Sequence, residues 1–170
     1  MSKIFSIALT GPPKSGKSTI CMKVVEALRK KGLHIGGMTS GELHDQKGRV
    51  GFEIVDLLSG RRGILAHVNQ AEGPRVSKYR VNLRDLEEIG VRSIKNAMDS
   101  GADLIVVDEI GPMELHSEKF VHIVNELLAS DKNVLVTVHF RASHELIKRI
   151  REEMEVCEVT RENRDRMVEL

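Results

Sequence analysis

Short apolar stretches alternate with amphipathic ones along most of the chain. Five of them are rich in aliphatic or β-branched residues, as buried strands are: Lys3–Thr10, Leu33–Met38, Leu104–Asp108, Val134–His139 and Val156–Val159. Between them, apolar residues recur at the spacing of helices. The alternation predicts an α/β layer fold whose mostly parallel sheet is flanked by helices and joined by right-handed crossovers.

The expected helices have recognisable starts and stops. One begins near Lys17 and ends where Arg29-Lys30-Lys31 precedes Gly32. A second begins at Leu83, with Leu86, Ile89, Ile94, Ala97 and Met98 on one broad face. The last two are predicted over Ser117–Leu128 and Ser143–Arg151, with Ser117 and Ser143 as their N-caps.

The segment over residues 39–81 has a different texture. Glycines divide it into short pieces in which polar and apolar residues partly alternate, for example Gly51–Leu57. We expect β-hairpins here, as an antiparallel insert. The 170 residues of the chain suit one domain, since a chain of this size buries about 70% of its unfolded surface. We therefore predict a single domain over residues 1–170, with the β-rich insert inside it.

Composition and charge exclude several classes of protein. The chain is 41% hydrophobic and 30% charged, which excludes collagen-like and mostly disordered proteins. Its 26 Lys and Arg balance 25 Asp and Glu, so a general nucleic-acid or membrane binder is not expected. Cys21 and Cys157 show no metal or disulfide spacing and suit a reducing, cytoplasmic location. Neither a signal peptide nor a membrane span is predicted.

The sharpest signal is the segment Gly11–Ser18, a complete GxxxxGK[ST] pattern between an expected strand and an expected helix. Glycines turn backbone N–H groups inward, and the helix start presents free donors and a positive dipole end to phosphate oxygens. Lys17 is expected to reach the β- and γ-phosphates, and Ser18 to bind magnesium. The residues predicted to bind a nucleotide here are Gly11, Pro12, Pro13, Lys14, Ser15, Gly16, Lys17, Ser18 and Thr19.

Two carboxylates end the aliphatic strand at Asp108 and Glu109. Because parallel strands end on the edge where ligands bind, Asp108 is expected to face Ser18 and hold Mg²⁺. Glu109 is then a candidate to orient the attacking water, and Glu114 to share the water or orient Glu109. The alternatives are a solvated loop position for Glu109 and a charge at a helix start for Glu114. The predicted catalytic residues are Lys17, Glu109 and Glu114.

Other polar residues are weaker candidates. Thr137 and His139 end a strand at the same edge, where either can sense phosphate or water. Asn163 offers amide donors and an acceptor for a base, although a turn explains it nearly as well. Five basic residues are candidates to neutralise charge in the transition state, and the sequence does not choose among them: Arg49, Lys78, Arg141, Arg161 and Arg164.

Taken together, these motifs resemble a small family of P-loop nucleoside-triphosphatases, typified by the cancer-related nucleoside-triphosphatase and its often thermophilic prokaryotic counterparts. The resemblance covers almost the whole chain, and its most diagnostic block is Asp108–Leu115. Further matches are Gly36–Thr39, Gly48–Ala66, Lys78–Val81 and Thr160–Arg164.

The resemblance implies slow, magnesium-dependent hydrolysis of ATP, GTP and other nucleoside triphosphates on a RecA-like α/β core. Two residues depart from the family pattern. Lys14 stands where glycine is common, which adds a cation but demands backbone angles that a non-glycine residue accepts reluctantly. Pro112 stands where lysine is common, which removes a cation near the water.

Hydrolysis of nucleoside triphosphates with low base selectivity is the leading expectation, because phosphate and metal contacts ignore the base. Two other classes stay open. A nucleotide or small-molecule kinase uses the same loop with an acceptor pocket, which the glycine-rich insert can supply. A nucleotide-regulated interaction module uses hydrolysis to reset a switch. The expected cofactor is Mg²⁺, and the expected ligands are nucleoside triphosphates, with no protein partner assigned.

Overall fold

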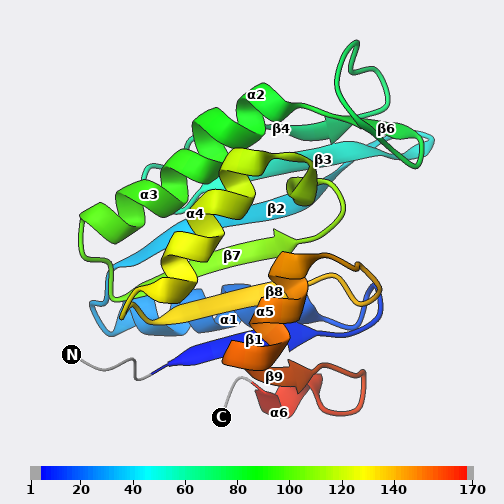
Figure 1. Ribbon diagram of the computed structural model, residues 1–170. Coiled ribbons are helices and arrows are strands. Elements are labelled where there is room, and N and C mark those ends of the chain that lie inside the picture. The colour runs from blue at the N-terminus through cyan, green and yellow to red at the C-terminus, as the bar shows by residue number, and fades with distance from the viewer. Residues whose placement is uncertain (1–4, 168–170) are drawn as a thin grey trace.

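A computed structural model describes residues 5–167 of the chain. Within those residues the strands form one nine-stranded sheet in the order β5-β6-β4-β3-β2-β7-β8-β1-β9, with helices on both faces (Figure 1). The strands are β1 (Ser6–Thr10), β2 (Ile35–Asp45), β3 (Gly48–Asp56), β4 (Arg62–His67), β5 (Arg75–Val76), β6 (Tyr79–Val81), β7 (Leu104–Ile110), β8 (Val134–Val138) and β9 (Glu155–Glu158).

One half of the sheet is parallel, as predicted. β1 lies between β8 and β9, and β7 lies between β8 and the first part of β2, all in parallel register. Leu9 is level with Thr137, and Val107 is level with Val136. The carboxyl ends of β1, β7 and β8 therefore meet at one edge of the sheet, where an α/β fold binds its ligands.

The other half is antiparallel and contains the hairpins expected over residues 39–81. β3, β4, β6 and β5 follow one another outward from β2. The expected end of the second strand at Met38 is wrong, because β2 continues as one strand to Asp45. Its residues are buried as far as Thr39 and progressively exposed beyond. The change from apolar to polar residues therefore marks where the two faces of the strand become exposed to solvent. It does not mark the end of the strand.

Helices cover the two faces of the sheet and enclose two cores. Helix α1 (Lys17–Lys30) packs on one face, and the short helix α6 (Arg164–Met167) contacts it. Helices α2 (Leu83–Asp85), α3 (Arg92–Asp99), α4 (Glu118–Ala129) and α5 (Glu145–Glu153) cover the other face (Figure 1). Neighbouring residues on the central strands serve opposite cores: Val106 packs under α1, and Val107 packs under α4. No helix within residues 5–167 is long and apolar enough to cross a membrane.

The helix predicted from Leu83 forms, but it is not α-helical throughout. Between α2 and α3 lies a π-helical segment, η1 (Leu86–Val91). Ile89 and Ile94 are five positions apart, and both are buried in the same core. The wider π turn, with its i→i+5 hydrogen bonds, brings residues at that spacing onto one face. The segment therefore keeps the apolar stripe on the sheet.

The predicted helix caps have different outcomes. The Ser117 side chain accepts a hydrogen bond from the Phe120 N–H and caps α4, as expected. The expectation for Ser143 is wrong: α5 begins at Glu145, and the His144 ring accepts from the Leu146 N–H in the capping position. Ser143 lies outside the cap and is exposed. Nδ1 of the His144 ring therefore accepts the capping hydrogen bond that we expected a serine oxygen to accept.

These two serines give a matched test of the cap assignment. Replacing Ser117 with Ala removes the cap of α4 and a 2.8 Å hydrogen bond from its hydroxyl to Glu87. We expect Ser117→Ala to lower the free energy of unfolding by about 1–2 kcal/mol. Ser143→Ala is expected to change it by less than about 0.5 kcal/mol. Urea titrations of both variants measure the difference, and equal losses would contradict the assignment.

Candidate active site

The phosphate loop joins β1 to α1 and is pressed against the segment that follows β9. A Cβ on Gly11 would lie 2.5 Å from the Val159 carbonyl oxygen, and a Cβ on Gly16 would lie 3.1 Å from Cδ of Arg164. Both positions also have positive φ angles, 153° and 109°, so only glycine fits without strain. Because Gly16 holds the N-cap position and has no side chain, the first N–H groups of α1 are left for a ligand.

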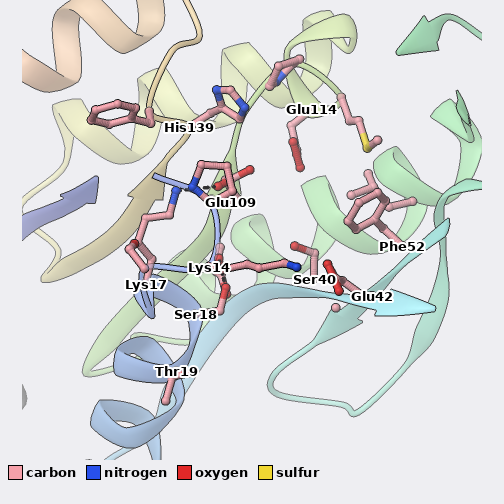
Figure 2. A pocket seen from close by; sticks show the side chains of 18 of the residues that line it. Lys14, Lys17, Ser18, Thr19, Ser40, Glu42, Phe52, Glu109, Glu114 and His139 are labelled. Atoms are coloured by element: carbon pink, nitrogen blue, oxygen red, sulfur yellow. Dashed lines mark hydrogen bonds and ion pairs between the residues drawn. The ribbon is translucent and has the colours of Figure 1, made fainter. Parts of the chain in front are cut away.

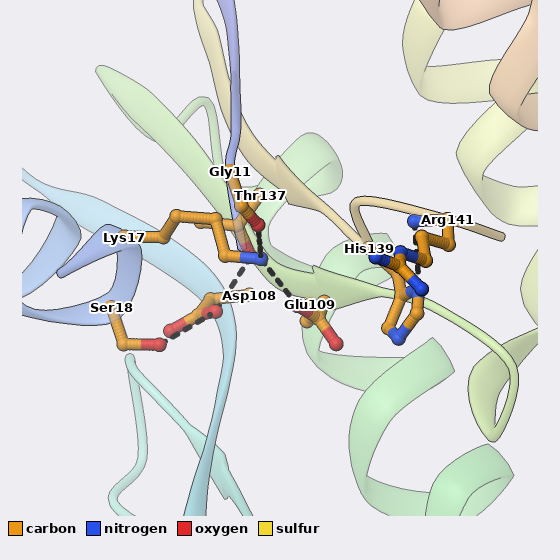
Figure 3. A network of polar contacts seen from close by, with 8 residues as sticks. All are labelled: Gly11, Lys17, Ser18, Asp108, Glu109, Thr137, His139 and Arg141. Carbon is orange, nitrogen blue, oxygen red and sulfur yellow. Dashed lines mark hydrogen bonds and ion pairs between the residues drawn. The ribbon is translucent and has the colours of Figure 1, made fainter. Parts of the chain in front are cut away.

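Two lysines of this loop line the same cavity but differ in their surroundings. The Lys17 ammonium donates to the Gly11 carbonyl at 3.0 Å and lies 3.4 Å from Oε2 of Glu109 (Figure 3). Lys14 is exposed and has a φ of 64°. The backbone at Lys14 is therefore left-handed, a conformation that a non-glycine residue adopts at a cost.

Asp108 is the buried carboxylate of the site. Its side chain lies at the end of β7, and the residue is only 2% exposed. Oδ1 accepts hydrogen bonds from the hydroxyls of Thr137 at 2.6 Å and Ser18 at 3.2 Å (Figure 3). Burial raises the pKa of Asp108 to about 6, and these two hydrogen bonds oppose the shift. The prediction that Asp108 faces Ser18 is confirmed by this contact.

The oxygen atoms around Asp108 fit a magnesium ion. Oδ2 of Asp108 is buried with no hydrogen-bond partner among the described residues, although buried polar atoms are normally paired. With the Ser18 hydroxyl it offers hard oxygen donors. Residues 5–167 contain no group of three His, Cys, Asp or Glu placed to hold a metal. Mg²⁺ uses few protein ligands and takes its others from water and phosphate.

Glu109, near the end of β7, and Glu114, in the chain that follows β7, approach the same space. Glu109 lies beside Lys17, and Glu114 sits on the short 3₁₀ helix η2 (Glu114–His116) with 3% of its surface exposed. Burial, and then the negative charge of Glu109, raise the pKa of Glu114 to about 8. Glu114 is therefore largely protonated at neutral pH. The structure places the two carboxyl groups on one cavity, while their catalytic roles stay predictions.

The cavity has a volume of about 600 Å³ and extends well beyond the phosphate loop. Residues 13–19 form one wall, and the ends of β7 and β8 contribute Asp108, Glu109 and His139. The opposite wall comes from the antiparallel half of the sheet, where Ser40, Glu42 and Phe52 are prominent (Figure 2). Nothing in the local sequence except the glycine-rich texture of residues 39–81 pointed to these side chains.

The structure separates the five basic candidates. Arg49 and Arg164 line the cavity, whereas Lys78, Arg141 and Arg161 are not part of its lining. Arg49 is held in place: it donates to the Tyr79 hydroxyl at 2.9 Å and to Glu42 at 2.8 Å. Its guanidinium lies 4.9 Å from the centre of the Phe52 ring. Arg164 lies against the phosphate loop at Gly16.

The weaker polar candidates also separate. Thr137 is fully buried and gives its hydroxyl hydrogen to Asp108, so it orients that carboxylate. His139 lines the cavity, and its Nδ1 accepts from the Arg141 N–H at 3.2 Å. Asn163 is not part of the cavity lining. Its amide oxygen accepts from the Thr160 N–H, and its amide nitrogen donates to the Glu158 carbonyl, so these atoms secure the turn before α6.

A phosphate-binding loop between a strand and a helix, facing a buried acidic strand end at one sheet edge, defines a P-loop nucleotide-binding protein. A family model described as NTPase matches residues 6–170. The chain belongs to this NTPase family.

Individual relatives agree over nearly the full length. The nucleoside-triphosphatase THEP1 of Methanosarcina acetivorans is 48% identical over 164 residues, covering 96% of this chain and 92% of the relative. Among solved structures, the crystal structure of THEP1 from Aquifex aeolicus matches with a TM-score of 0.83 at 30% identity, covering 96% of this chain and 94% of that chain. The solution structure of a human cancer-related nucleoside triphosphatase matches with a TM-score of 0.79 at 33% identity, covering 97% and 94%.

The buried acid makes stability depend on pH in a defined direction. The unfolded chain releases the Glu114 proton near 4.5, and the folded chain keeps it until about 8. Between these values the folded state binds more protons, so stability falls as pH rises. We expect Glu114→Gln to flatten this dependence and to raise the unfolding free energy most at pH 8. Urea titrations from pH 5 to 8 check it, with the exposed Glu118→Gln as the control that keeps the wild-type slope.

Proposed function

We propose that the protein hydrolyses nucleoside triphosphates to diphosphate and phosphate with magnesium, with little selectivity for the base. Membership of the NTPase family makes the chain a nucleoside-triphosphate phosphatase. The observation that carries the proposed mechanism is the juxtaposition of three groups at one sheet edge. These are the Lys17 ammonium, the unpaired Oδ2 of Asp108 and the Glu109 carboxylate.

The phosphate loop and α1 bind the triphosphate tail. The free N–H groups at the start of α1 receive phosphate oxygens, and Lys17 adds a full positive charge at the β- and γ-phosphates. In the structure that charge faces Glu109 at 3.4 Å. When phosphate oxygens arrive they compete with Glu109 for the ammonium, and the carboxylate is released to face the γ-phosphate. Binding of the substrate thereby prepares the base.

Asp108 and Ser18 are the residues that hold magnesium. When bound, the ion neutralises charge that develops on the β- and γ-phosphate oxygens. The hydrogen bond from Thr137 fixes the carboxylate of Asp108, so that its second oxygen points to the metal position. Arg164, beside the loop at Gly16, is the cavity-lining arginine placed to contact the bound phosphates or base.

Glu109 orients the water and accepts its proton during attack. Its carboxylate lies 3.4 Å from the Lys17 ammonium before substrate binds, while Glu114 is buried and protonated nearby. A neutral carboxyl donates a hydrogen bond and adds no second negative charge near the attacking oxygen. We therefore assign Glu114 to orientation of the water or of Glu109, and Glu109 to proton removal.

Low base selectivity follows from where the contacts lie. The groups described above engage phosphates, metal and water, all of which are the same in every nucleoside triphosphate. The amide of Asn163, the sequence-predicted contact for a base, is engaged within its own turn. Asn163 therefore acts on binding indirectly, because it stabilises the segment that packs on Gly11 and Gly16.

The first test is a substrate and metal profile. We expect the purified protein to release inorganic phosphate from ATP, GTP, CTP and UTP with Mg²⁺, at rates within about tenfold of one another, which is ~1.4 kcal/mol of discrimination. EDTA in excess of the metal is expected to stop the reaction, and added Mg²⁺ to restore it. A phosphate-release assay gives both results. A strong preference for one base would contradict the proposed low base selectivity.

The second test separates binding from catalysis. Glu109→Gln keeps the size of the side chain but removes both the base and the charge that pairs with Lys17. We expect turnover to fall about 100-fold to 10,000-fold, with ATP affinity by calorimetry unchanged or higher because Lys17 is no longer shared. Glu118→Gln, on the exposed face of α4, is the matched control. Normal turnover in the Glu109 variant would contradict the proposal that Glu109 removes the proton from water.

A further inference from the structure

We infer that the half of the cavity formed by the antiparallel strands binds a second small molecule, a neutral hydroxyl compound with a flat aromatic ring, which accepts the γ-phosphoryl group. We call this half the acceptor subsite and define it by Ser40, Arg49, Phe52, Leu65, Val76 and Met113. The inference rests on the proposed function, because it uses the same bound triphosphate and the same Glu109.

The size of the cavity is the first argument. Hydrolysis needs room beside the γ-phosphate for one water molecule, which occupies about 30 Å³ in the liquid. The cavity measures about 600 Å³ and continues from Glu109 to β3, β4 and β5. The phosphate loop lines one end of this cavity, where the triphosphate binds, and the part lined by these strands is additional to that end. In Figure 2, Ser40 and Phe52 face the space from the side opposite Lys17 and Ser18.

The chemistry of the walls indicates the kind of molecule. Phe52, Leu65, Val76 and Met113 provide apolar contact, and the flexible Met113 adapts to a ring. The charge of Arg49 is already matched by Glu42 at 2.8 Å and shielded by the Phe52 ring. These six residues therefore offer no unmatched cation for a second polyphosphate, and Lys14 of the cavity, which is unpaired among the described residues, belongs to the phosphate loop, whereas a neutral ring compound is accommodated. Ser40 adds a hydroxyl for a polar substituent.

The subsite also faces the reacting group. Glu109, which would take the proton of water, lines the same cavity and is reached from the acceptor subsite. The acceptor hydroxyl oxygen forms a bond to the γ-phosphorus, and its proton passes to the Glu109 carboxylate. The bond between the γ-phosphorus and the β–γ bridging oxygen breaks, and the nucleoside diphosphate leaves. Nucleosides combine a flat aromatic ring, whose faces suit apolar contact, with free hydroxyls, and so match the space.

The test uses ATP labelled with ³²P in the γ position, Mg²⁺ and each of adenosine, guanosine, cytidine, uridine and thymidine in turn. Thin-layer chromatography separates labelled phosphate from labelled nucleoside monophosphate. We expect labelled monophosphate with at least one nucleoside, at about tenfold or more above the reaction without protein. Phosphate as the sole labelled product with all five nucleosides would overturn the inference while leaving the proposed hydrolysis intact. No phosphate release without nucleoside would instead contradict the proposed function.

Two variants test the location of the subsite. Ser40→Leu fills the space, and Phe52→Ala removes a wall. Each is expected to lower the ratio of labelled monophosphate to labelled phosphate by about tenfold or more, the discrimination typical of an apolar pocket. Leu58→Ala changes an exposed apolar residue outside the cavity and is expected to keep the wild-type ratio. If Phe52→Ala does not fold, Ser40→Leu decides alone, and an unchanged ratio in it would place the acceptor elsewhere.

Discussion

The site depends on one buried carboxyl group. A carboxylate away from water is costly unless hydrogen bonds compensate it, and Asp108 receives two, from Thr137 on β8 and Ser18 on α1. Those bonds fix three elements relative to one another at the same sheet edge. The remaining oxygen has no protein partner among the described residues. The hydrogen bonds that make Asp108 tolerable in the core therefore also leave its second oxygen free for the metal ion that we propose.

The single sheet contains two kinds of architecture with different tasks. Its parallel half brings the ends of β1, β7 and β8 together and so builds the proposed phosphate and metal site. Its antiparallel half supplies the far wall of the cavity through β2 and β3. Because β2 runs without a break from the parallel half into the antiparallel half, the two walls are parts of one hydrogen-bonded framework.

The sequence predicts those features that depend on the types and spacing of neighbouring residues. The phosphate loop, the acidic strand end and the Ser117 cap follow from residue types at short separations, and the structure shows each of them in place. Parallel pairing also predicts that Asp108 faces Ser18, but other features that distant contacts decide were not predicted. Glu114 becomes buried only because η2 folds under the cavity, and His144 replaces Ser143 because α5 begins one residue later than expected. The hydroxyl of Thr137 goes to Asp108 because β7 and β8 are paired.

The topology also dictates the order in which the nucleotide site is completed. β1 and its loop are among the earliest described residues, yet β1 pairs only with β8 and β9, more than a hundred residues further along. The segment that presses on Gly11 and Gly16 is later still. A ribosome therefore synthesises the phosphate loop long before its neighbours exist. During translation the emerging polypeptide therefore carries this motif without the strands that shape it until β8 and β9 have been made.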